Sequence, residues 1–79
     1  MNDEIAELKH LIKLTFEWNR LKRMYLMTIT SIKQLAKSTR SMLESSARAE
    51  MENRIQILNN SKKEIEGLMV KIENEVVNF

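Results

Sequence analysis

The sequence predicts an all-α protein, a helical hairpin of two long antiparallel amphipathic helices that completes a four-helix bundle or coiled coil with a partner chain. The 79 residues include no proline and one glycine, Gly67, whereas a β-protein needs turn residues at short intervals. Apolar residues recur three and four positions apart in both halves of the chain, which is typical of packed helices. The two rows are out of phase, and a turn between them explains the offset.

The first row predicts a helix over about residues 3–38. Acidic residues lie in its first turns and lysines in its last turns, as the helix dipole favours. Ile5, Leu8 and Ile12 extend the apolar face toward the N-terminus. The members of this first row are Leu11, Leu14, Trp18, Leu21, Tyr25, Thr28, Ile32 and Leu35.

The second row predicts a helix over about residues 42–78, and only Lys62 interrupts it. Ser61 and Glu64 fit the capping box that begins a helix, so a break at residues 59–61 stays open. Against a break, the row passes through these residues in register. The members of this second row are Met51, Ile55, Leu58, Lys62, Ile65, Met69, Ile72, Val76 and Phe79.

The turn between the helices is predicted at about residues 38–46. Five of the nine residues from Ser38 to Ser46 are serine or threonine, which favour caps and turns. Ser41 and Glu44 fit a capping box at the start of the second helix. One unbroken helix is the alternative, since neither glycine nor proline marks this turn.

A chain of this length forms one domain, here residues 1–79, and buries a modest core. Because it has no cysteine, neither disulfides nor thiolate zinc sites stabilise it. We therefore expect a protein partner, as a homo-dimer or a hetero-oligomer. Apolar residues outside the rows provide association surfaces: Phe16, Leu26, Met27, Ile57, Val70 and Val77.

Helix–helix packing is predicted to involve the apolar members of both rows. Trp18 and Tyr25 are one heptad apart, so both are expected to face the interface. The predicted interface residues are Leu11, Leu14, Trp18, Leu21, Tyr25, Ile32, Leu35, Met51, Ile55, Leu58, Ile65, Met69, Ile72 and Val76.

No catalytic, cofactor-binding or metal-binding residues are predicted, and we expect the chain not to be an enzyme. His10 is the only histidine, so a catalytic triad would depend on it alone. Glu7 and His10 match one Glu-x-x-His unit of di-iron bundles, but such a site needs two units and two further glutamates. A glycine-rich phosphate loop is excluded by the single glycine.

The charge of the chain is unevenly distributed. Residues 1–40 hold eight Lys or Arg and four Asp or Glu, a net charge of +4, and residues 41–79 hold five and seven, a net charge of −2. The densest basic cluster is Arg20, Lys22 and Arg23, which makes nucleic-acid binding the alternative function. A basic amphipathic helix with Phe16 and Trp18 also fits a membrane surface.

No transmembrane segment is predicted, since the longest run without charge is the nine residues Met24–Ile32. The acidic N-terminus argues against a secretory signal, so we expect a cytoplasmic protein.

The expected function is that of a small helical protein–protein interaction module, a chaperone, adaptor or regulator. In length and hairpin shape the chain resembles the type III secretion needle cochaperones, and in outline the four-helix plasmid copy-number regulators. The first resemblance implies a chaperone role.

Overall fold

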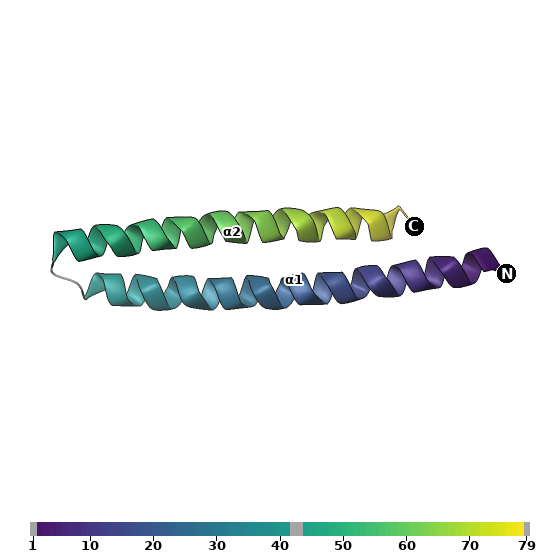
Figure 1. The fold of residues 1–79 in the computed structure, drawn as a ribbon, viewed down its shortest axis with the longest axis horizontal. Coiled ribbons are helices and arrows are strands. Elements are labelled where there is room, and N and C mark those ends of the chain that lie inside the picture. Colours follow the sequence, from purple (N-terminus) through teal and green to yellow (C-terminus); the bar gives the residue numbers. More distant parts are fainter. Residues whose placement is uncertain (1, 42–43, 79) are drawn as a thin grey trace.

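The protein is a helical hairpin, as the sequence predicts (Figure 1). The structure, a computed structural model, describes residues 2–41 and 44–78. Helix α1 spans Asn2–Arg40 and helix α2 spans Ser45–Val77, and the two run antiparallel, side by side. The molecule is a rod with extents of 66 × 15 × 13 Å. The prediction of two long helices is confirmed, and a single unbroken helix is wrong.

The connection between the helices is shorter than predicted, because α1 continues to Arg40. The Thr39 hydroxyl donates to the carbonyl oxygen of Leu35 at 2.7 Å, so this residue is satisfied within the helix. The backbone N–H and the hydroxyl of Ser41 both donate to the carbonyl oxygen of Ser38, at 3.2 and 2.9 Å. With these hydrogen bonds, α1 ends at Arg40, two residues after its predicted end at about residue 38.

The predicted capping box of Ser41 and Glu44 does not form. Glu44 has extended backbone angles, φ −80° and ψ 123°, and itself precedes the first helical residue, Ser45. The Glu44 side chain makes no capping hydrogen bond to this end of α2. Residues 42 and 43, predicted as the start of the second helix, lie outside the described residues.

Helix α2 runs without a break through residues 59–61, which answers the question that the sequence leaves open. Asn60 accepts a side-chain hydrogen bond from Gln56 at 3.3 Å, one turn earlier in the same helix. The second row therefore stays on one continuous face, and Ser61 is an interior helical residue.

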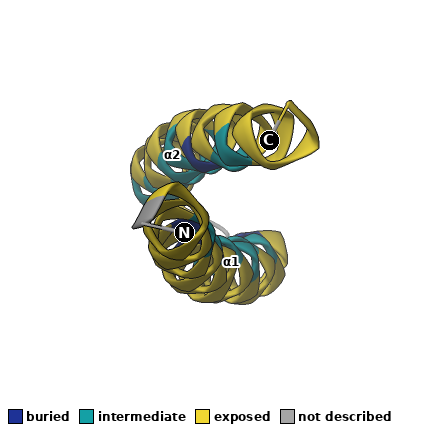
Figure 2. Cartoon of the chain, turned by 90° about the vertical axis from the view of Figure 1, so that its right-hand side faces the viewer, coloured by how far each residue is buried: buried dark blue, intermediate teal, exposed yellow. Residues whose placement is uncertain are grey.

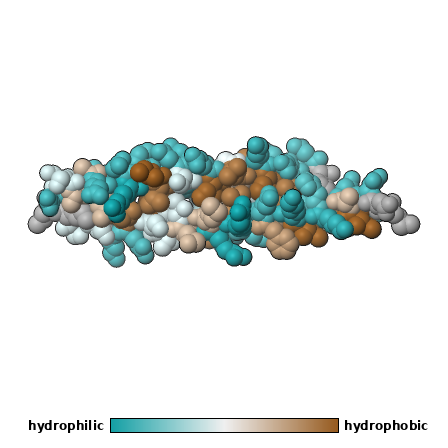
Figure 3. Space-filling view, in the orientation of Figure 1, coloured by the Kyte–Doolittle hydropathy of each residue, from teal (hydrophilic) through white to brown (hydrophobic). Residues whose placement is uncertain are grey.

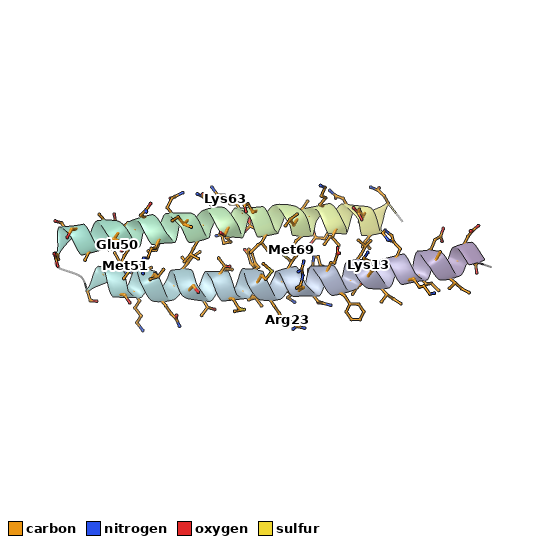
Figure 4. The ribbon with its side chains drawn as sticks, in the orientation of Figure 1. Lys13, Arg23, Glu50, Met51, Lys63 and Met69 are labelled. Atoms are coloured by element: carbon orange, nitrogen blue, oxygen red, sulfur yellow. The ribbon has the colours of Figure 1, made fainter. Side chains whose placement is uncertain are left out.

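Buried and half-buried residues lie on the sides of the helices that face each other (Figure 2). Among the described apolar side chains, Leu14, Leu21 and Ile65 are buried, with exposed fractions of 5, 5 and 7%. The buried polar residue Thr39 extends the first row by one more member. Figure 4 shows Met51 and Met69 on the side of α2 toward α1, whereas Arg23 and Lys63 point away from the facing helix. The core is thus a single thin stripe.

The predicted interface residues lie along this stripe with one exception. Val76 is 40% exposed because it belongs to the last turn of α2, where a hollow separates the helices. The remaining thirteen are buried or half-buried between α1 and α2: Leu11, Leu14, Trp18, Leu21, Tyr25, Ile32, Leu35, Met51, Ile55, Leu58, Ile65, Met69 and Ile72.

Neither helix, over the residues that the structure describes, contains a stretch long and apolar enough to cross a membrane.

Candidate interaction surfaces

Two hydrogen bonds between aromatic and acidic side chains fix how the helices align. The indole N–H of Trp18 donates to a carboxylate oxygen of Glu73 at 3.1 Å. The hydroxyl of Tyr25 donates to a carboxylate oxygen of Glu66 at 2.9 Å. The donors are one heptad apart on α1 and the acceptors one heptad apart on α2, so both bonds report the same antiparallel register.

This register places the polar members of the two rows at the same level. Thr28 lies three residues beyond Tyr25, and Lys62 lies four residues before Glu66, so the two face one another across the stripe. The hydroxyl of Thr28 donates to the Met24 carbonyl oxygen at 2.8 Å. Lys62 is half-buried, a position in which a lysine keeps its aliphatic stem against apolar surface and its ammonium in water. Lys62, the polar residue that interrupts the second row, therefore lies opposite Thr28, a polar residue of the first row.

Polar groups line the long flank of the stripe that carries these hydrogen bonds, the aromatic side, but a hollow opens on it beside Trp18 and Glu73, toward the end of α2. We define the aromatic side by Trp18, Lys22, Tyr25, Glu66 and Glu73. The Lys22 ammonium lies 5.3 Å from the centre of the Trp18 ring, a cation–π distance. The polar end of each aromatic side chain is therefore hydrogen-bonded across to α2, and an ammonium group lies over the face of the indole.

The pKa of the Tyr25 hydroxyl tests whether the hydrogen bond to Glu66 forms on the aromatic side. Its hydrogen bond to Glu66 raises the pKa of the Tyr25 hydroxyl above its ordinary value of 10.0, with smaller contributions from desolvation and from the Glu66 charge. Since the folded-state pKa is raised, the bond stabilises the protein below pH 10 and is lost as pH rises through the raised value.

Because Tyr25 is the only tyrosine, absorbance of tyrosinate reports on it alone. We expect a titration midpoint above 10.0 and a shift back toward 10.0 in Glu66→Gln. Glu64→Gln, two residues away, is the matched control and should leave the midpoint unchanged. A midpoint insensitive to Glu66→Gln would contradict the register.

The opposite flank, the methionine side, is open. We define the methionine side by Met24, Met27, Leu58 and Leu68. Two hollows lie along it. A hollow of about 270 Å³ is rimmed by Glu17, Arg20, Leu68, Lys71 and Glu75 over the row residues Leu14, Leu21 and Ile72. A second, of about 290 Å³, is lined by Met24, Met27, Thr28, Ser31 and Leu58.

Heptad positions show that both hollows belong to one side. Met24 lies one heptad after Glu17, and Met27 lies one heptad after Arg20, so these residues point the same way from α1. Met24, Met27 and Leu68 are 44, 69 and 50% exposed. Figure 3 shows one face of the hairpin, on which hydrophobic side chains gather among hydrophilic ones.

The open end of the hairpin is a third surface. Since Trp18 is level with Glu73, Val77 is level with Leu14, and α1 extends past α2 (Figure 1). The extension back to Asn2 is about 18 Å long at a rise of about 1.5 Å per residue. Ile5, Leu8 and Ile12 on this extension are 53, 59 and 53% exposed. Beside it, a hollow of about 320 Å³ has an almost wholly apolar lining: Leu14, Thr15, Trp18, Ile72, Glu73, Val76 and Val77.

The basic cluster of the sequence does not form one continuous stripe. Arg20, Lys22 and Arg23 are all exposed. Arg20 lines the first hollow of the methionine side, with Leu68. Lys22 lies over Trp18 on the aromatic side, and Arg23 points away from α2 (Figure 4). The structure therefore distributes these three charges around α1.

Within the described residues, no three or more His, Cys, Asp or Glu side chains come together as a possible metal site. Glu7 and His10 lie on the extension of α1, beyond the end of α2.

Comparison of the chain with protein families, curated proteins and solved structures finds no match.

Proposed function

We propose that this chain is a small, non-enzymatic protein–protein interaction module, a chaperone, adaptor or regulator, that binds an amphipathic helix of another protein at its open end. One observation carries the proposal: α1 extends beyond α2 with three exposed apolar residues beside an apolar hollow. The proposed location is the cytoplasm, as the sequence predicts.

The spacing of the exposed residues supports a helical partner. Ile5, Leu8 and Ile12 are three and four residues apart, which places them on one stripe of α1. Such a stripe packs against another helix through side chains at the same spacing. Each of these residues follows a position of the first row by one residue, so their stripe is turned about 100° from the face of α1 that packs on α2. A partner helix on this stripe would lie along the aromatic side and reach the hollow at Val76 and Val77. Burial of these side chains would supply the binding free energy, about 25 cal/mol per Å² of apolar area.

The test is site-specific photo-crosslinking in the cells that produce the protein. A photoreactive amino acid at Leu8 or Ile12 should capture a protein, since both side chains lie on the proposed surface. The matched controls are their neighbours Lys9 and Lys13, which point about 100° away around the helix and should capture little. Equal capture at all four positions, or none, would contradict the proposal.

Nucleic-acid binding through α1 is the alternative function, because Arg20, Lys22 and Arg23 remain exposed to solvent. Contacts of basic residues with phosphates weaken steeply as salt rises. Binding of random duplex DNA or RNA that follows this dependence and is lost in Arg20→Gln/Arg23→Gln would favour the alternative.

A further inference from the structure

The hairpin exposes a large area for its mass. The chain exposes 6548 Å², whereas the relation between area and mass for compact monomers gives about 5,000 Å² at 9.3 kDa. The excess, about 1,500 Å², arises because each helix of the rod buries only one stripe. Obligate homodimers bury about 1,000–2,500 Å² per chain. Burying one long face of the rod against another chain would therefore bring the exposed area of this chain close to that of a compact monomer.

The two long flanks differ in how well the chain covers them itself. On the aromatic side, Glu66 and Glu73 accept hydrogen bonds from α1, Lys22 lies over the Trp18 ring, and a hollow opens toward the end of α2, at the surface assigned to the proposed function. On the methionine side, two hollows remain open over Leu14, Leu21 and Leu58. Burying the methionine side removes apolar area from water without breaking these cross-helix bonds, which makes it the favourable face for a long contact.

The charges of the methionine side suit a second copy of this chain. Glu17, Arg20, Lys71 and Glu75 rim the first hollow, two acidic and two basic residues, so this part of the surface is neutral. By contrast, the outward surface of α1 carries Arg23, and α1 as a whole is basic. Two copies that meet on the methionine side therefore face no net repulsion there.

We infer that two copies of this chain associate through their methionine sides to form a four-helix bundle. In a two-fold dimer the same surface serves both partners, so a protruding side chain of each copy enters a hollow of the other. Leu68 and the highly exposed Met27 rim the hollows and supply these side chains. This inference goes beyond the proposed function, because it concerns a different surface from the open end and names a second copy of the chain as the partner there.

The test is the mass of the purified chain in solution, by sedimentation equilibrium, with a matched pair of variants. Leu68 and Val70 are 50 and 51% exposed and two residues apart on α2, but only Leu68 lines a hollow of the methionine side. We expect about twice 9.3 kDa for the unaltered chain and for Val70→Glu. Leu68→Glu should weaken dimerisation at least about 30-fold. Helicity by circular dichroism checks that both variants fold.

Met27→Glu is the second variant on this face, at a position 69% exposed, and should also favour the monomer. A monomeric unaltered chain at micromolar concentration overturns the inference, as does a dimer that survives both Leu68→Glu and Met27→Glu. These outcomes are separate from crosslinking at Leu8 and Ile12. A monomer that captures a foreign protein at the open end would retain the proposed function and remove the dimer.

Discussion

Leu21→Ala should destabilise the hairpin by about 3 kcal/mol, the middle of the range for a buried leucine. Leu21 is 5% exposed and lies at the centre of the packed stripe, between the levels of Trp18 and Tyr25. The truncation removes apolar side-chain area that is buried from water in the folded protein. It also leaves a cavity that two rigid helices cannot close. Because a core this thin supplies only about 3–5 kcal/mol of net stability, the variant should retain about 0–2 kcal/mol and unfold at a much lower urea concentration.

Urea unfolding followed by circular dichroism at one fixed protein concentration measures this effect, since association makes stability depend on concentration. Leu26→Ala is the matched control: it is the same substitution in the same helix, five residues away and 52% exposed. It should change the free energy of unfolding by less than about 0.5 kcal/mol. Similar losses for the two variants would show that α1 is turned differently about its axis.

Trp18→Ala should cost about 2 kcal/mol, less than a fully buried tryptophan because this ring is half-buried. The substitution removes three contributions together: the apolar area of the half-buried ring, the hydrogen bond to Glu73, and the cation–π contact with Lys22. It also widens the hollow at the open end. Circular dichroism is again the measurement, because the variant loses the only tryptophan of the chain.

The control for Trp18→Ala is Phe16→Ala, an aromatic truncation two residues away in the same helix. Phe16 is 71% exposed, so its loss should cost less than about 0.5 kcal/mol. Trp18→Phe separates the contributions, since it keeps most of the packing and removes the indole donor. If Phe16→Ala proved the more costly variant, the assignment of the first row to the interior would be wrong.

The helices themselves could be predicted from the sequence because their signals are local. Leu14, Leu21 and Ile65 belong to the predicted rows and are the buried apolar residues among those described. The ends of the helices were harder to predict, because capping motifs compete. Ser41 and Glu44 fit a capping box, yet Thr39 and Ser41 donate to carbonyl oxygens at the end of α1 instead.

The partners of Trp18 and Tyr25 were missed, although a signal existed. Glu66 and Glu73 are one heptad apart, as are the two aromatic residues, but spacing within one helix carries no information on which residues of another helix lie level with it. That level is seen only when the two helices are paired, and the two hydrogen bonds report it.

The sequence by itself determined that the chain forms two amphipathic helices and which stripe of each is apolar, because the helical period is a property of consecutive residues. The tertiary structure decided which flank of the stripe is covered and which is open. Pairing in one register brings Glu66 and Glu73 to the aromatic side and leaves Met24, Met27 and Leu68 exposed on the other. That difference arises only when two helices meet, since a single helix has no covered flank.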